Sequence, residues 1–190
     1  MSTAAHRFDR EQFVADCVAA RGDGGMPAVR EVLQRAVSDH RAVLDALGQP
    51  TGAAMDVFLQ SPTLTIFTAH WTPRMNLLPH DHMMEALIGI YTGREDNILW
   101  RRSEEGSIEA HDVNCLFEGD VAALPADAIH SVTNPLLRFT GGIHIYDGDY
   151  FAAYRHQWDP DTLAEEPSDG EFIRQMFADE NQRYQESIFR

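Results

Sequence analysis

The chain has 190 residues, of which 44% are hydrophobic, and this length most simply forms one domain with a sizeable core. Its formal net charge is −15 at pH 7, and all 15 basic residues are arginines. Such an acidic surface argues against a nucleic acid or an anionic membrane as partner, because both attract basic patches.

Two further features bear on where the protein works. No apolar run approaches the length that spans a bilayer, and charged residues within 7–11 interrupt any signal-peptide core. Cys17 and Cys115 are the only cysteines, and two distant cysteines make neither a disulfide framework nor a zinc knuckle. The sequence therefore predicts a cytoplasmic protein with reduced thiols. The oligomeric state stays open, with a homodimer as one candidate.

The first part of the chain is expected to be helical. Apolar residues recur at helical spacing through 9–47. The glycine-rich stretch 22–25 breaks this pattern, and Pro27 is expected to open a second helix that runs to Leu47. Gly48-Gln49-Pro50 should end it.

From Met55 the pattern changes to short strands with turn residues between them, among which are Gly93 and Glu105-Gly106. The expected strands are 57–60, 63–71, 76–82, 86–92, 97–102, 107–113, 120–124, 130–134 and 138–146. Many short strands at regular spacing predict an antiparallel sandwich or barrel. We expect one domain over 1–190, with N-terminal helices in 1–50, a β-barrel core in 55–147 and a C-terminal extension in 148–190 whose last twenty residues are helical.

Three histidines carry the strongest chemical signal. His80 and His82 are two residues apart within an expected strand, and this spacing places both imidazoles on one side of a strand. His130 follows about fifty residues later, at the start of another expected strand. Together they predict a mononuclear metal site with three imidazole ligands and open coordination positions.

The residues next to this site are expected to be unremarkable. Asp81, between two ligands, should point outward to a turn or the surface, and 94–96 should form a solvated hairpin. Met84 shares the ligand face and should line the pocket, whereas Met83 should not. The other five histidines receive no role: His6, His40, His70, His111 and His156.

The order of these residues resembles the two motifs of the cupin superfamily. His80-x-His82 followed by Gly93 matches the first motif, and Gly119-Asp120-x4-Pro125-x4-His130-x3-Asn134 matches the second. The resemblance covers about 77–146 and implies a mainly β fold, the cupin double-stranded β-helix or jelly-roll barrel, with the metal inside. The cupin glutamate is expected at Ala86 or Leu87, which are apolar. Glu85 is one residue too early and should point away, so it stays an alternative to a ligand set of three histidines.

A cupin with three histidines looks like a thiol dioxygenase of the cysteine dioxygenase type. Gly142-Ile143-His144-Ile145-Tyr146 resembles the Ser-x-His-x-Tyr string of that family. The resemblance implies that Tyr146 and His144 are catalytic residues and that the cofactor is Fe(II), with Zn, Ni or Mn as alternatives in a purified sample. Tyr146 would donate a hydrogen bond beside the metal, and His144 would orient Tyr146.

Three departures limit what the resemblance implies. Gly142 replaces the serine, so another group must orient His144. Ala86 stands where the animal enzyme has a cysteine that is crosslinked to the tyrosine, so no crosslink forms there. No arginine lies in 42–73, where family members acting on carboxylic thiols hold the carboxylate. The chain looks more like a bacterial cysteine-dioxygenase-like group whose substrate is poorly defined.

The function expected from this resemblance is oxidation of a small thiol to a sulfinate with O2. Three neutral imidazoles leave the charge of a 2+ ion uncompensated, which favours a thiolate as ligand. Other cupin activities remain open: a dioxygenase for another substrate, or a metal-dependent hydrolase or isomerase. A sensor that binds a small molecule or a metal without turnover is also open, because function belongs to the site and not to the fold.

Overall fold

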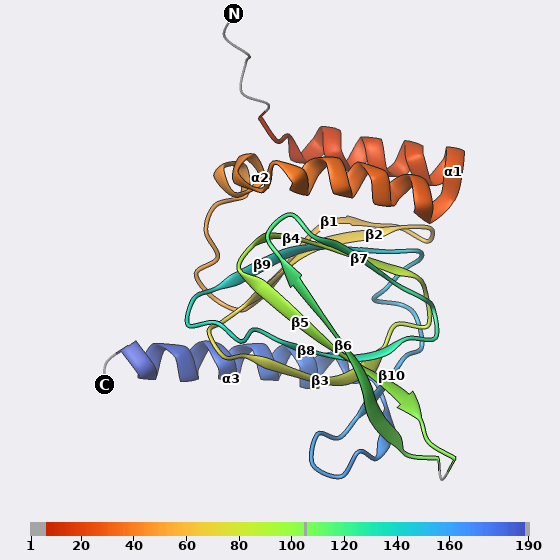
Figure 1. Cartoon of the computed structure of the whole chain (residues 1–190), viewed down its shortest axis with the longest axis vertical. Coiled ribbons are helices and arrows are strands. Elements are labelled where there is room, and N and C mark those ends of the chain that lie inside the picture. The colour runs from red at the N-terminus through yellow and green to blue at the C-terminus, as the bar shows by residue number, and fades with distance from the viewer. Residues whose placement is uncertain (1–6, 105, 189–190) are drawn as a thin grey trace, which may run out of the picture.

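The computed structural model describes residues 7–104 and 106–188, so Glu105 of the expected turn and His6 lie outside the described residues. Its strands form two antiparallel sheets that enclose the core (Figure 1). The five-stranded sheet has the order β1-β2-β9-β4-β7, and the six-stranded sheet has the order β11-β10-β3-β8-β5-β6. The strands are β1 Ala54–Gln60, β2 Thr65–Trp71, β3 Asn76–Asp81, β4 Ala86–Thr92, β5 Arg94–Arg102, β6 Ile108–Phe117, β7 Val121–Leu124, β8 Ile129–Thr133, β9 Thr140–Tyr146, β10 His156–Trp158 and β11 Glu165–Pro167. This is the predicted double-stranded β-helix.

The N-terminal helices cover the five-stranded sheet, above the barrel in Figure 1. Helix α1 spans Arg10–Ser38 and bends at Gly25, whose φ of 68° is not helical; helix α2 spans His40–Leu47. The expectation of a helix running unbroken from Pro27 to Leu47 is wrong, because the side chain of Asp39 accepts from the N–H of Ala42 and starts a new helix. Helix α2 ends at Gly48 as expected.

Close contact between α1 and the sheet depends on one glycine. A Cβ atom on Gly89 would lie 2.9 Å from the side chain of Leu33 and 3.1 Å from that of Val37. The missing side chain lets the apolar face of α1 rest directly on β4. Leu33, Val37, Leu87 and Tyr91 belong to the core cluster that fills this layer.

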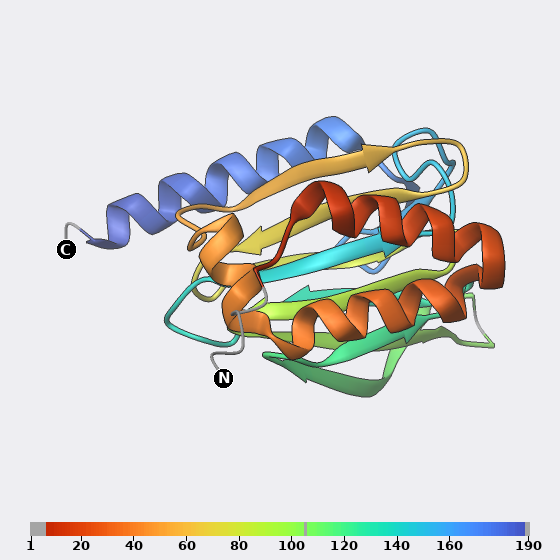
Figure 2. The ribbon, with the colours of Figure 1, turned by 90° about the horizontal axis from the view of Figure 1, so that it is seen from above.

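The C-terminal helix α3, Gly170–Ile188, lies at one edge of the barrel when the molecule is seen from above (Figure 2). Asn181 fixes it there: its Oδ1 accepts from the N–H of Ala53 at 2.7 Å, and its Nδ2 donates to the carbonyl of Ala53 at 3.0 Å. Phe177 of α3 is buried in the cluster between the sheets, where its ring lies 5.6 Å from that of Trp71. The extension therefore closes one side of the barrel interior, and its short strands β10 and β11 were not predicted.

The turn between β4 and β5 differs from the expectation of a solvated hairpin. Gly93 has a φ of 85°, and a Cβ there would meet the carbonyl oxygen of Phe139 at 2.8 Å. Because the turn is tight, β5 begins immediately after it at Arg94, and alternate residues of this strand point into the barrel. Glu95 is fully buried, whereas Arg94 and Asp96 pair with each other at 2.6 Å on the other face.

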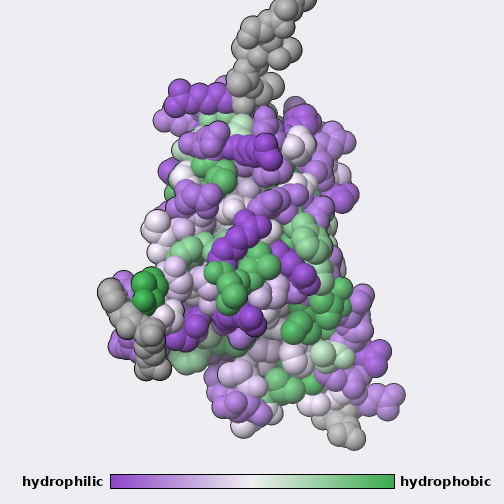
Figure 3. Space-filling model, turned by 60° about the vertical axis from the view of Figure 1, so that its left-hand side comes forward, coloured by the Kyte–Doolittle hydropathy of each residue, from purple (hydrophilic) through white to green (hydrophobic). Residues whose placement is uncertain are grey.

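The surface fits the acidic composition. The face shown in Figure 3 is mostly hydrophilic, with hydrophobic residues gathered in separate patches. Among the described residues, no helix combines the length and the apolar character needed to cross a membrane.

Candidate metal centre

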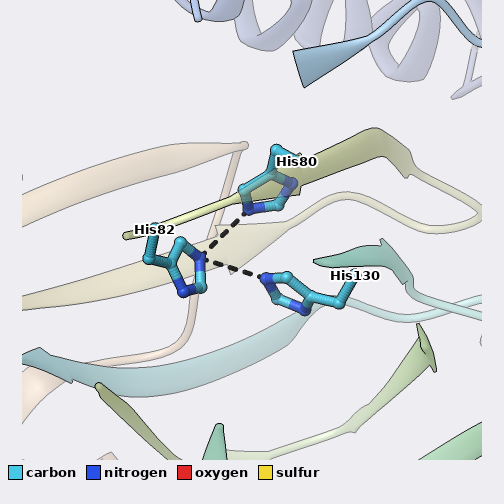
Figure 4. A group of neighbouring side chains, drawn as sticks. All are labelled: His80, His82 and His130. Atoms are coloured by element: carbon cyan, nitrogen blue, oxygen red, sulfur yellow. Dashed lines mark hydrogen bonds between the residues drawn. The ribbon is translucent and has the colours of Figure 1, made fainter. Parts of the chain in front are cut away.

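Three imidazoles meet inside the barrel, each from a different point of the chain (Figure 4). Antiparallel pairing of β3 with β8 places His80 directly opposite His130, and His82 follows the end of β3. Nε2 of His82 lies 3.3 Å from Nε2 of His80 and 3.1 Å from Nε2 of His130. All three side chains are buried. The structure thus brings together the three residues that the sequence singled out.

Hydrogen bonds hold two of the rings with Nε2 toward the centre. The Nδ1–H group of His80 donates to the carbonyl oxygen of Leu78 at 3.0 Å, and that of His130 donates to Oδ1 of Asn97 at 2.6 Å. Burial lowers the pKa of His80 to about 4 and the pKa values of His82 and His130 well below 6.5. The rings are therefore neutral at pH 7 and present lone pairs to one another.

This arrangement fits a transition-metal ion. Two nitrogen ligands about 2.1 Å from one ion, at angles of about 90–109°, lie roughly 3.0–3.4 Å apart, which is the spacing of these Nε2 atoms. Nε2 of His80 and Nε2 of His130 each present a lone pair to the centre, because their Nδ1–H groups donate elsewhere, and Nε2 of His82 lies within 3.3 Å of both. Glu85 is exposed and does not belong to the group, so the donor set is nitrogen alone.

His144 and Tyr146 lie beside this centre on β9. The hydroxyl of Tyr146 is 3.3 Å from Nδ1 of His144, and its ring packs edge-on against His82 with centroids 4.9 Å apart. Burial, together with the charges of Tyr150 and Glu95, raises the pKa of Tyr146 well above 10, so the phenol keeps its proton. Ala86 pairs directly with Tyr146 in the register of β4 and β9, as the sequence implied.

Glu95 is the most important residue that sequence reasoning missed. Its Oε2 accepts from Nε1 of Trp71 at 2.7 Å, and its Oε1 accepts from Nδ2 of Asn97 at 3.0 Å. Burial alone would raise its pKa, but His144 together with the donors of Trp71 and Asn97 lowers it below the ordinary value. Glu95 is thus a buried carboxylate. The sequence signal that could have identified it is that Glu95 and Asn97 are alternate residues directly after the turn at Gly93, so they share one face of β5.

Glu95 faces the corner that Gly142 leaves open. Oε2 of Glu95 lies 3.4 Å from Nε2 of His144, a buried nitrogen that makes no hydrogen bond within the described residues. A Cβ on Gly142 would lie 3.3 Å from the same nitrogen, so a serine there would occupy this corner. The carboxylate of Glu95 is therefore the charged group that lies next to His144.

Asp81 does not point to the surface as expected, because the chain returns over it. Its Oδ1 accepts from the N–H of His156 at 2.8 Å, and its Oδ2 accepts from Nδ1–H of His156 at 2.7 Å. Asp81 is buried, and Gln157 next to His156 pairs with His80 in the β10–β3 ladder. Asp81 therefore attaches the C-terminal extension beside the metal centre. Met83 is exposed and Met84 packs against the interior cluster, as expected from alternation.

A second missed residue, Arg155, comes from the same extension. With His80, His130, His144 and Tyr146 it lines a cavity of about 30 Å³ at the metal centre. Its guanidinium carbon lies 3.9 Å above the ring of Tyr150, and its buried Nε atom has no hydrogen-bond partner among the described residues. The extension gives no periodic pattern before its final helix, so no signal in the sequence placed Arg155 here.

Comparisons with known proteins find distant structural similarity alone. No protein-family model matches the chain, and no curated protein matches it. A solved structure of an uncharacterised protein with a double-stranded β-helix domain from Klebsiella pneumoniae is 13% identical, with 66% of this chain and 94% of that chain covered and a TM-score of 0.43.

Two further solved structures are similar to the same degree. A cupin family protein from Methanocaldococcus jannaschii is 10% identical over 54% of this chain and 85% of its own, with a TM-score of 0.45. A variant of oxalate decarboxylase from Bacillus subtilis is 16% identical over 54% of this chain and 27% of its own, with a TM-score of 0.43. Likeness at this level says nothing about activity. The double-stranded β-helix of this chain is defined by its own strand order.

Proposed function

We propose that the chain is a non-haem iron dioxygenase that oxidises a small thiol to a sulfinate. One observation carries this proposal: the His144–Tyr146 pair lies directly beside a centre of three neutral histidines. The contact between them is the packing of the Tyr146 ring against the ring of His82. Fe(II) held by His80, His82 and His130 would supply dioxygen activation, so that a thiol RSH and O2 become the sulfinic acid RSO2H. This equation balances without an external reductant.

The charge of the donor set supports a thiolate substrate. The three imidazoles are neutral and no carboxylate joins them, so a 2+ ion keeps its full charge at the centre. An anion is favoured at such a centre, and a thiol loses its proton there more readily. Within residues 7–104 and 106–188, Glu95 is the one buried carboxylate that contacts the His144–Tyr146 pair.

The remaining residues position and shield the reacting groups. The protonated phenol of Tyr146 can turn its hydrogen toward a negatively charged group beside the histidines, and His144 fixes the position of the phenol. Phe67 packs on both rings of the pair, with centroids 5.7 Å from His144 and 5.2 Å from Tyr146. A dry, packed wall of this kind strengthens hydrogen bonds to charge and keeps bulk water out.

Oxygen uptake with a panel of thiols tests the proposal. Protein loaded anaerobically with Fe(II) is mixed with cysteine, 3-mercaptopropionate, cysteamine and longer thiols, and the product is analysed by mass spectrometry. We expect one O2 consumed per thiol and a mass gain of two oxygen atoms. Turnover that is equal with Zn(II) and without O2 would support a hydrolase or isomerase instead. Binding of thiols without any O2 consumption would support a sensor.

A further inference from the structure

A second cavity opens next to the metal centre, under the C-terminal extension. It has a volume of about 310 Å³, and we call it the vestibule. Its walls are mainly apolar and come from β1, from the segment after β9 and from α3: Ala53, Met55, Tyr150, Phe151, Ile173 and Phe177. Two arginines, Arg155 and Arg174, also line it.

The vestibule and the metal cavity share a boundary. Met55, Tyr150, Arg155, Ile173 and Phe177 line both of them. The metal cavity of about 30 Å³ is only as large as one water molecule or one small head group. The vestibule is ten times larger, so a molecule that reacts at the histidines keeps most of its body in the vestibule.

Stacked rings connect the two spaces. The guanidinium of Arg155 lies over Tyr150, the rings of Tyr150 and Tyr146 are 4.4 Å apart, and the Tyr146 ring contacts His82. Arg155, Tyr150, Tyr146 and His82 thus form a row of stacked groups. Arg155 lies at its vestibule end, and His82 lies at its end in the metal centre.

The backbone of Arg155 is fixed while its side chain is free to bind. Its carbonyl accepts from the N–H of Ser168 at 2.9 Å, and the N–H of the next residue, His156, donates to Asp81. In contrast, its guanidinium makes neither a hydrogen bond nor an ion pair within the described residues, although the chain has 30 acidic residues and only 15 basic ones. Arg174, the other arginine of the vestibule, is already paired with Glu171. A cation that lines a cavity and has no anion beside it attracts an anionic ligand, so Arg155 points to a ligand of that charge.

We propose that the vestibule is a substrate subsite for an amphipathic acid. The apolar body of the ligand lies against Met55, Ile173 and Phe177, its carboxylate contacts Arg155, and its reacting head enters the metal cavity. The identity of that head, a thiol, rests on the proposed function, whereas the subsite itself rests on the cavity and on Arg155. The substrate would then be larger and more apolar than an amino-acid thiol.

Isothermal titration with thiol-free probes tests the subsite apart from turnover. Octanoate is compared with octanol, and butanoate and hexanoate complete a length series. We expect octanoate to bind more tightly than octanol, and affinity to rise about threefold to fourfold for each methylene that the vestibule buries. Arg155→Gln should weaken octanoate binding about tenfold or more and leave octanol unchanged, because it removes a charge-assisted hydrogen bond.

Two control variants complete the design. Arg174 lines the same vestibule but is paired with Glu171, so Arg174→Gln should change the affinity for octanoate less than twofold. His130→Ala, which lacks a metal ligand, should still bind octanoate, because the carboxylate contacts Arg155 and not the metal. Equal binding of octanoate and octanol, an unchanged affinity in Arg155→Gln, an equal loss in Arg174→Gln, or loss of binding in His130→Ala would each overturn the subsite. A failed thiol oxidation with these binding results intact would overturn the proposed function alone.

Discussion

Oε2 of Glu95 and Nε2 of His144 lie 3.4 Å apart although the two residues belong to opposite sheets, on β5 and β9. Glu95 also reaches the metal centre on the other side, because it holds the amide of Asn97, whose oxygen accepts from His130. One buried carboxylate therefore lies between His130, which it reaches through Asn97, and the His144–Tyr146 pair.

Glu95→Gln is expected to keep the metal and lose activity. The amide keeps the shape of the side chain but removes the charge that faces His144, so we expect kcat to fall at least tenfold with KM little changed. Elemental analysis and steady-state oxygen uptake measure the two properties. Glu109→Gln, which breaks an exposed pair with Arg101, is the matched control and should leave both unchanged. Equal kcat values for Glu95→Gln and the wild type would remove Glu95 from the site.

The charge of Glu95 also predicts how stability depends on pH. Its folded pKa lies below the ordinary value, so its contribution is present above the unfolded pKa of about 4.3 and is lost as the pH falls through the folded pKa. Glu95→Gln should therefore be less stable than the wild type at pH 7, by about 1–3 kcal/mol. Urea unfolding at pH 7, 5 and 3 should show that this difference in unfolding free energy persists at pH 5 and narrows below about pH 4. A difference that widens in acid would mean that Glu95 is protonated in the folded protein.

Each ligand histidine is expected to be necessary for metal binding. His130→Ala should remove most of the metal, because two imidazoles hold a divalent ion far less tightly than three do. Elemental analysis compares the metal content of His130→Ala with that of His111→Ala, purified in parallel, because His111 is exposed and should not bind the metal. Added Fe(II) or Zn(II) should raise the melting temperature of the wild type and of His111→Ala but not of His130→Ala, because ligands that bind the folded state stabilise it. Full occupancy in His130→Ala would refute the assignment.

Tyr146→Phe should retain the metal and slow turnover. Losing a hydrogen bond made mainly in the transition state costs about 2.7–4 kcal/mol, or roughly a hundredfold to a thousandfold in rate. His144→Gln should cost less, since His144 acts through Tyr146. With Ala86 opposite Tyr146, the wild-type protein should run as a single band on a denaturing gel. A fully active Tyr146→Phe enzyme would make Tyr146 a packing residue.

The two cysteines should differ in reactivity. Cys17 belongs to α1 and is fully buried, and burial together with Asp16 raises the pKa of its thiol to about 12. At pH 8 about one Cys17 in ten thousand is then a thiolate, so iodoacetamide should label it only after unfolding. Peptide mass spectrometry of native and urea-treated samples measures this, with the partly exposed Cys115 as the internal comparison. Rapid labelling of native Cys17 would show that α1 opens away from the sheet.

The sequence alone determined the barrel and the group of three histidines, because both follow from local periodicity. Strand β4 has the predicted bounds, and the two-residue spacing of His80 and His82 needs only an extended backbone to bring both rings to one side. The same alternation placed His144 and Tyr146 together on β9.

Tertiary structure decided what surrounds these residues. Glu95 and Asp81 look like surface acids in the sequence, and they are buried because β5 turns inward at Gly93 and because β10 returns to cover β3. Arg155 lies about 25 residues beyond His130 and reaches the cavity because Gln157 pairs with His80 and His156 bonds to Asp81. Contacts of this kind depend on where distant segments pack, and periodicity within a segment carries no information about its partners.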